Sequence, residues 1–238
     1  SFLWRRMIKI EGLPIIRTKI MIPALRRRMV HRPHLIEQIE KGLPQGFVLV
    51  SAPPGFGKTT LVADWASQAS IPVIWLSLDS QDNDLTVINR YLLNLLENRF
   101  TSIQPLLAEF IPDGNEEHVF RSLEVALINA CSEAESDLAV VLDDYHLVQN
   151  PQIHEGLQFL LEHMPPHLKI ILITRKDPPF PLSRLRANNQ VCELRAADLI
   201  FTHKEAAEFL SETMQLHLNE SQVGQILRRT EGWITGLQ

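Results

Sequence analysis

The segment Ala52-Pro53-Pro54-Gly55-Phe56-Gly57-Lys58-Thr59 connects an apolar run, residues 47–51, to a helical pattern that begins at Lys58. It matches the P-loop pattern G-x-x-x-x-G-K-[ST], except that Ala52 stands where the first glycine is usual. An apolar strand before the loop and a helix after it are the context that this motif requires. The segment therefore predicts a phosphate-binding loop between a buried strand and a helix.

The residue types of this loop suit the binding of a nucleotide. Glycines allow the backbone N–H groups of about residues 55–60 to turn toward phosphate oxygens, and the N-terminus of the next helix adds positive potential. We expect Lys58 to bridge the β- and γ-phosphates and the Thr59 hydroxyl to be a ligand of Mg²⁺. The residues that this loop contributes to the predicted nucleotide site are Pro54, Gly55, Phe56, Gly57, Lys58, Thr59 and Thr60.

Short apolar runs alternate with helical patterns from residue 47 onward. In the segment 84–98, apolar side chains recur every three or four residues, as in a helix that lies on a sheet. Strands that are apolar throughout indicate a parallel sheet covered on both faces. We therefore predict a doubly wound α/β fold. The expected strands are 47–51, 73–78, 138–142, 169–174 and 191–194, and the expected helices are 58–69, 84–98, 115–134 and 151–163.

Candidate catalytic and metal-binding residues follow two further predicted strands. The run 138–142 is followed by Asp143 and Asp144, and ligands of such sheets bind beyond the C-terminal strand ends, where the P-loop also lies. We expect Asp143 to hold Mg²⁺, mostly through water, and Asp144 to orient or deprotonate the attacking water. Arg175 follows the run 169–174 and can contact a γ-phosphate. The predicted catalytic residues are Lys58, Asp144 and Arg175, and the predicted metal ligands are Thr59 and Asp143.

Composition restricts the class of protein. The chain has 238 residues, a net charge of −5 and two cysteines, Cys131 and Cys192, which exclude a disulfide framework and suit a reducing compartment. No run approaches the ~18 uninterrupted apolar residues of a membrane-spanning helix. We expect a cytoplasmic protein that does not contact a membrane.

The charge is unevenly distributed. Residues 1–33 contain nine Lys or Arg residues and one acidic residue, Glu11. We interpret this segment as a basic arm that neutralises an acidic body, with nucleic-acid binding as the alternative. After residue 200, Thr202-His203-Lys204-Glu205 predicts the start of a helix, a second helix surrounds Val223, and a third begins near Glu231. We expect this helical subdomain to continue beyond Gln238.

In this order the motifs resemble the nucleotide-binding (NOD) domain of MalT-like regulators of the LuxR family, within the STAND class of P-loop ATPases. The likeness extends from about residue 18 to Gln238. Besides the P-loop, the segments that carry it are Val30-His31-Arg32-Pro33-His34-Leu35, Trp75-Leu76-Ser77-Leu78-Asp79, Val141-Leu142-Asp143-Asp144-Tyr145-His146, Thr174-Arg175-Lys176-Asp177-Pro178-Pro179, Glu193-Leu194-Arg195-Ala196-Ala197-Asp198-Leu199 and Arg229-Thr230-Glu231-Gly232-Trp233.

The resemblance implies a five-stranded, mainly parallel sheet in which the Arg175 strand is inserted between the P-loop strand and the Asp143 strand. It also implies that Val30 and Arg32 flank the adenine. Ile234 stands where the family has the proline of a Gly-x-Pro motif that contributes to the base site, so this chain departs from the family at Trp233-Ile234. The implied organisation is a basic arm and adenine-side segment at 1–33, a P-loop NTPase domain at 34–200 and a helical subdomain at 201–238.

For function, the resemblance implies ATP and ADP as ligands with Mg²⁺, slow hydrolysis, and an ADP-bound resting form that self-associates once ATP is bound. Winged-helix, sensor-repeat and DNA-binding domains would follow Gln238, so this fragment is not expected to bind DNA specifically. The alternatives are a P-loop kinase, a nucleotide-binding scaffold that does not hydrolyse, and a nucleic-acid-binding module. A kinase should carry an Arg-rich lid over an acceptor pocket, and the pair Asp143-Asp144 and the trailing helices favour the ATPase.

Overall fold

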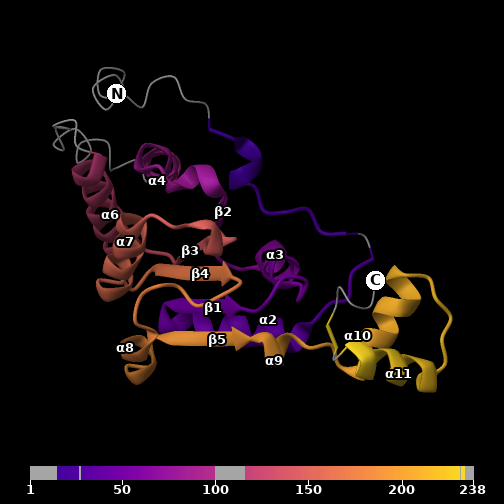
Figure 1. Ribbon diagram of the computed structural model, residues 1–238. Helices are drawn as coiled ribbons and strands as arrows, with labels where there is room; N and C mark the ends of the chain where they lie inside the picture. The colour runs from indigo at the N-terminus through magenta and orange to yellow at the C-terminus, as the bar shows by residue number, and fades with distance from the viewer. Residues whose placement is uncertain (1–14, 27, 100–115, 231, 234–238) are drawn as a thin grey trace.

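The computed structural model describes residues 15–26, 28–99, 116–230 and 232–233 (Figure 1). Within them, five strands form one sheet in the order β2-β3-β4-β1-β5, and every neighbouring pair is parallel. The strands are β1 (Phe47–Ser51), β2 (Val73–Ser77), β3 (Leu138–Asp143), β4 (Leu168–Thr174) and β5 (Val191–Arg195). Since β4 lies between β1 and β3, the inserted strand that the resemblance implies is confirmed.

Helices cover both faces of the sheet because its strands are apolar on both sides. Along β4, Ile170 and Leu172 belong to one buried cluster, and Ile171 and Ile173 belong to the other. The first cluster includes side chains of α4 (Leu85–Arg99), α6 (Glu116–Ser132), α7 (Pro151–Glu162) and α8 (Leu182–Ala187), and the second includes side chains of α2 (Pro33–Gly42), α3 (Lys58–Gln68) and α9 (Ala196–Leu199). The doubly wound α/β fold is therefore confirmed.

A helical region follows the sheet and lies at one end of the molecule (Figure 1). It consists of α10 (His203–Glu208), a π-helix over Phe209–Thr213, and α11 (Glu220–Thr230). The predicted capping box is present, because the Thr202 hydroxyl accepts the Glu205 N–H while the Glu205 carboxylate accepts the Thr202 N–H. Of the third predicted helix, near Glu231, only Gly232 and Trp233 are described.

The helical region has a small apolar core of its own, made of Val30, Phe201, Ala206, Phe209, Leu210 and Val223. Val30 comes from the segment that precedes α2, so this core joins that segment to residues 201–223. Part of the basic segment is therefore integrated into the fold. Lys19, in the 3₁₀ helix Arg17–Ile20, is buried and donates to Asp82 Oδ2 at 2.5 Å, and its Nζ lies 3.0 Å from Asp79 Oδ2.

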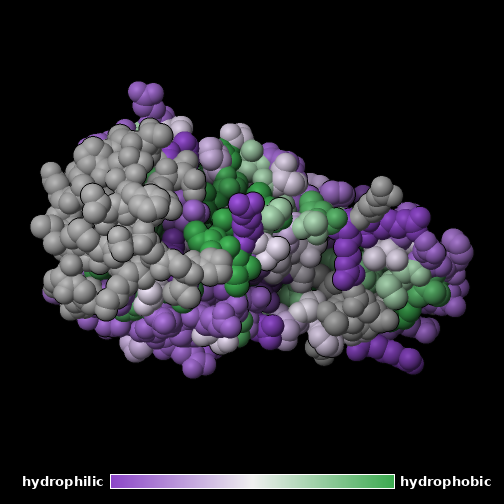
Figure 2. Space-filling model, turned by 90° about the horizontal axis from the view of Figure 1, so that it is seen from above, coloured by the Kyte–Doolittle hydropathy of each residue, from purple (hydrophilic) through white to green (hydrophobic). Residues whose placement is uncertain are grey.

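Seen from above, the molecule shows apolar surface in the middle of the face and again at the end that carries the helical region, with polar surface along the lower edge of the view (Figure 2). The exposed apolar side chains near the 3₁₀ helix are Ile16, Met21 and Ile22. Among the described helices, none combines the length and the hydrophobicity that crossing a bilayer requires.

Candidate functional site

The P-loop connects β1 to α3, and two glycines determine its path. Gly55 has φ +83° and Gly57 has φ +73°, which is the left-handed region that favours glycine. Gly57 is the N-cap residue of α3, and no side chain caps that end of the helix. Because the first N–H groups of a helix have no acceptor within it, the N-terminus of α3 is suited to bind an anion.

Lys58 begins α3 and directs its ammonium group back into the loop. Its side chain is buried, and Nζ donates to the carbonyl oxygen of Pro53 at 2.9 Å. Burial lowers the pKa of Lys58, and the positive charge of Arg175 lowers it further, while Asp144 and Asp143 act in the opposite direction. Because Lys58 and Arg175 repel each other, an anion bound beside both would stabilise the site.

Thr59, in the first turn of α3, contacts Asp143, the last residue of β3. The Thr59 hydroxyl donates to Asp143 Oδ1 at 3.1 Å, and the Asp144 N–H donates to the same oxygen at 2.9 Å. Asp143 is only 3% exposed, and burial, followed by repulsion from Asp144, raises its pKa to about 6. A cation at this carboxylate would offset the free-energy cost of a buried negative charge, so the donor set suits Mg²⁺.

Mg²⁺ at this position would need oxygen ligands beyond the protein. In the described part of the chain, no three acidic, histidine or cysteine side chains gather around a common point. Thr59 and Asp143 supply one hydroxyl and one carboxylate. Mg²⁺ commonly keeps several waters and binds through one or two protein oxygens and the phosphates of a nucleotide, so these two residues fit it.

Asp144 differs from Asp143 in its exposure. Its side chain is 45% exposed, and its backbone has φ +55°, a left-handed conformation that Asp tolerates better than most residues. His146 Nδ1 lies 3.7 Å from Asp144 Oδ1. The two neighbouring carboxylates thus have different environments, one buried against Thr59 and one open to solvent. This difference suits a metal ligand and a residue that contacts water.

Arg175 follows the last residue of β4 and is exposed. Its charge acts on Lys58 and also lowers the pKa of His146, for which burial is the larger cause. The structure therefore brings the predicted residues Lys58, Thr59, Asp143, Asp144 and Arg175 to one edge of the sheet. Their catalytic and metal-binding roles stay predictions.

A cavity of about 250 Å³ lies next to the P-loop. It is lined on one side by the part of the chain that contains the sheet and its covering helices, here named the sheet domain, and on the other by the helical region. Five predicted nucleotide-binding residues line it: Val30, Arg32, Gly55, Gly57 and Thr60. Phe201, Phe209 and Thr213 line it from the other side. Of the remaining predicted residues, Phe56 packs against the core around α2 and α3, and the Pro54 carbonyl accepts a hydrogen bond from the Trp233 indole.

Arg32 has a structural role that the sequence did not indicate. Its buried guanidinium donates to Glu205 Oε1 at 2.7 Å, to the Leu199 carbonyl at 3.0 Å and to the Ile200 carbonyl at 2.9 Å. Because Glu205 neutralises its charge, Arg32 holds the segment before α2 against the helical region. Its predicted contact with adenine stays a prediction.

Trp233 belongs to the segment at which this chain departs from the family's Gly-x-Pro motif. Gly232 has φ +71° and its carbonyl accepts the Phe201 N–H at 3.1 Å, which turns the chain after α11 back toward the sheet domain. The indole Nε1 of Trp233 then donates to the Pro54 carbonyl at 3.0 Å. The segment after α11 therefore contacts the P-loop directly. Ile234 lies outside the described residues.

The parallel sheet, the Lys58-Thr59 loop at the start of α3 and the carboxylates at the end of β3 define the fold and the site of a P-loop ATPase. The family model for the AAA ATPase domain matches residues 33–173, more than half of the chain. The chain belongs to this family.

The chain is also similar to longer regulators. Over 94% of its length it is 32% identical to the HTH-type transcriptional regulator MalT of Yersinia enterocolitica and to that of Serratia proteamaculans. It spans 25% of the length of each relative. Among solved structures, Cdc6p from Pyrobaculum aerophilum has a TM-score of 0.53 at 12% identity, with 90% of this chain and 59% of that chain covered, so it supports the fold alone.

The raised pKa of Asp143 predicts how stability without nucleotide depends on pH. An ordinary Asp pKa is 3.8, so between about pH 4 and pH 6 the folded state binds more protons than the unfolded state. The free energy of unfolding therefore falls as pH rises through this window. We expect Asp143→Asn, which does not ionise, to be more stable than the parent at pH 8 by on the order of 2 kcal/mol.

Urea unfolding of both proteins at pH 8 and pH 4.5 measures this difference. It should be largest at pH 8 and should shrink at pH 4.5. The same difference at both pH values would contradict the proposed ionisation of a buried Asp143.

Proposed function

We propose that this chain is the ATP-binding and slowly hydrolysing switch domain of a STAND signal-transduction ATPase, in a MalT-like transcriptional regulator of the LuxR family. The observation that carries the proposal is the bond of 3.1 Å between Thr59 Oγ1 and Asp143 Oδ1, with Lys58 buried beside them. The similarity to MalT regulators over 94% of the chain supports the biological class.

Binding is assigned to the P-loop and the neighbouring cavity. The N–H groups at the start of α3 and the Lys58 ammonium would contact the phosphates, and the base would occupy the cavity that Val30 and Thr60 line. Lys58 would then exchange its bond to the Pro53 carbonyl for bonds to phosphate oxygens. ADP can use these contacts as well as ATP, because they do not require a γ-phosphate.

Hydrolysis is assigned to the edge formed by β3 and β4. Mg²⁺, when bound, would neutralise phosphate charge, with Thr59 and Asp143 as its protein ligands. Asp144 is exposed enough to accept a hydrogen bond from water and to orient it, while Arg175 carries a permanent charge that can stabilise the γ-phosphate oxygens. The two neighbouring carboxylates would therefore have separate roles, Asp143 as the metal ligand and Asp144 as the base that orients water.

The first test of this assignment is Lys58→Ala. Because charge-assisted bonds to phosphate each contribute about 1.5–3 kcal/mol, we expect ATP and ADP to bind about tenfold more weakly or worse. Calorimetric titration of the variant and the parent measures both affinities. Lys41→Ala is the control, because Lys41 is an exposed lysine of α2 paired with Glu37. Parental affinities in Lys58→Ala would contradict the site.

Asp144→Asn separates binding from chemistry. The amide keeps the shape of the carboxylate but is a much weaker base, so we expect Mg-ATP to bind while turnover falls about 10²-fold or more. Phosphate release at saturating ATP gives the rate. The control is Asp137→Asn, at the opposite end of β3, which should keep the parental rate. Turnover by Asp144→Asn at the parental rate would remove Asp144 from the mechanism.

The same turnover assay, applied to the parent, discriminates the alternative functions. A scaffold that binds nucleotide without hydrolysing it would show no turnover in the parent either, and a kinase would transfer phosphate to an added acceptor. The described structure favours the switch, because the cavity is lined by both the sheet domain and the helical region. A nucleotide bound there would contact both and could change how they pack.

We further propose that exchange of ADP for ATP controls self-association of the longer regulator, and that this chain alone stays mainly monomeric. An Arg supplied by a neighbouring subunit can contribute about 10³ in rate, so turnover by the isolated chain should be slow. Light scattering with and without Mg-ATP measures the assembly. DNA titrations at two salt concentrations should show only weak, salt-sensitive binding through Arg26, Arg27 and Arg28. A stable ATP-dependent ring or sequence-selective DNA binding would contradict this division of roles.

A further inference from the structure

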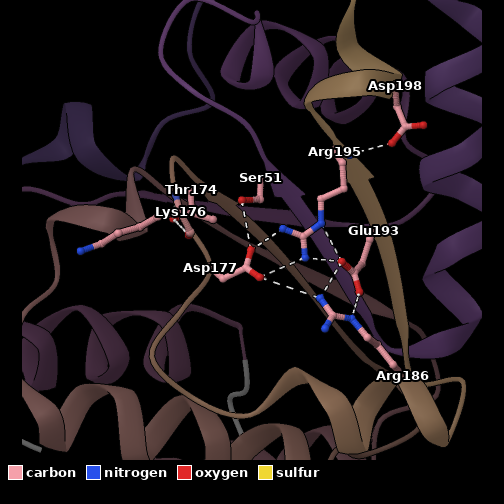
Figure 3. Close-up of polar contacts among 8 residues, drawn as sticks. All are labelled: Ser51, Thr174, Lys176, Asp177, Arg186, Glu193, Arg195 and Asp198. Atoms are coloured by element: carbon pink, nitrogen blue, oxygen red, sulfur yellow. Dashed lines mark hydrogen bonds and ion pairs between the residues drawn. The ribbon is translucent and has the colours of Figure 1, made fainter.

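A network of alternating charges lies at the edge of the sheet, beside the loop that follows β4 (Figure 3). Its members are Asp177, Arg186, Glu193 and Arg195, two acids and two bases. Glu193 Oε1 accepts from Arg186 Nε at 2.5 Å, and Glu193 Oε2 accepts from Arg195 Nε at 2.6 Å. Asp177 Oδ1 pairs with Arg195 Nη1, and Asp177 Oδ2 accepts from Arg195 Nη2 at 3.4 Å. Arg195 is therefore held by two carboxylates.

This network crosses the P-loop strand. Asp177 follows β4, Arg195 ends β5, and β1 lies between these two strands in the sheet. Ser51, the last residue of β1, pairs in register with Arg195 and donates its hydroxyl to Asp177 Oδ1 at 3.5 Å. The loop after β4 is thus fastened across the end of the strand from which the P-loop starts.

The network fixes one end of a short turn, and Thr174 fixes the other. Thr174 is 1% exposed, its carbonyl accepts the Ala52 N–H at 3.3 Å, and its hydroxyl donates to the Lys176 carbonyl at 2.7 Å. Arg175 lies between these two anchors. Lys176 extends away from the network (Figure 3).

Arg175 benefits from such anchors because the charge of Lys58 repels it. Its charge is near enough to lower the pKa of Lys58, and an exposed arginine has many rotamers available to it. Without a fixed backbone turn, its side chain would move away from Lys58 whenever no anion lies between them. Single exposed ion pairs contribute little to stability, but a bidentate network can fix the geometry of a loop.

We propose that Asp177 is a positioning residue that holds the 174–177 turn across β1, so that Arg175 faces the γ-phosphate of bound ATP. This inference rests on the proposed function. In this role Asp177 would act through Arg175 rather than on the nucleotide, and Arg195 would serve as its ion-pair partner rather than as a phosphate ligand. The expected consequence is discrimination between ATP and ADP, because only ATP carries the group that Arg175 contacts.

The test is a double-mutant cycle in which the ratio of ATP affinity to ADP affinity is measured with Mg²⁺ by calorimetry. Arg175→Ala should lower this ratio about tenfold, with ADP affinity unchanged. Asp177→Asn should lower it about threefold or more in the parent and should have no further effect in the Arg175→Ala background. Arg195→Gln removes the arginine that donates to both Asp177 oxygens and keeps Arg186, so it should reproduce the Asp177→Asn result.

The matched control is Glu162→Gln, which removes an ion-paired carboxylate at the end of α7, where Glu162 Oε1 lies 3.6 Å from Arg184. It should leave the ratio unchanged, and thermal unfolding should show that every variant folds. A parental ratio in Asp177→Asn and Arg195→Gln would overturn the inference. An equal effect of Asp177→Asn with and without Arg175 would overturn it as well, because the effect would then not act through Arg175.

The outcomes also separate the inference from the proposed function. If Arg175→Ala keeps the parental ratio while Lys58→Ala weakens both nucleotides, the site binds phosphate but Arg175 does not contact the γ-phosphate, and the positioning role is wrong. If the parent binds neither nucleotide, the proposed function itself fails, and the inference fails with it.

Discussion

All strands of the described sheet run in the same direction, and every part of the candidate site depends on this constraint. Parallel strands bring their carboxyl ends to one edge, so residues distant in sequence meet there: the P-loop after β1, Asp143 at the end of β3 and Arg175 after β4. The hydrogen bond between Thr59 and Asp143 is direct evidence that these segments lie together, because it joins side chains 84 residues apart. Without the parallel order, each group would be an isolated surface residue.

Electrostatics at this edge is unfavourable in the absence of an anion and a cation. Lys58 is a buried ammonium with a lowered pKa, and Asp143 is a buried carboxylate with a pKa raised to about 6. A phosphate beside Lys58 and a metal ion beside Asp143 would each favour the charged form of the side chain. Sites of this kind are stabilised by their ligand, which connects the geometry of the site to the proposed binding of Mg-nucleotide.

Local patterns predicted the five strands and the helices α3, α4, α6, α7, α10 and α11, because hydrophobic periodicity and capping are short-range properties. The short helices α8 and α9, and α2 before the P-loop strand, were not predicted. The strand around Leu168–Thr174, the glycine-rich loop and the Thr202 capping box all follow from neighbouring residues. The position of β4 between β1 and β3 came from the family resemblance, since periodicity says nothing about strand order. The partners of Arg32, the contact of Trp233 with Pro54 and the network around Asp177 were not predictable, because they join segments that only the folded chain brings together.

The most direct test of the proposed nucleotide site is a measurement of hydrogen exchange of the backbone amides with and without Mg-ATP. If phosphates bind at the start of α3 and the base lies between the sheet domain and the helical region, exchange should slow at residues 55–60, and also around Val30 and Phe201, which line the adjacent cavity. Unchanged exchange at residues 55–60 in the presence of saturating Mg-ATP, or protection confined to another surface, would contradict the assignment of this edge as the nucleotide site.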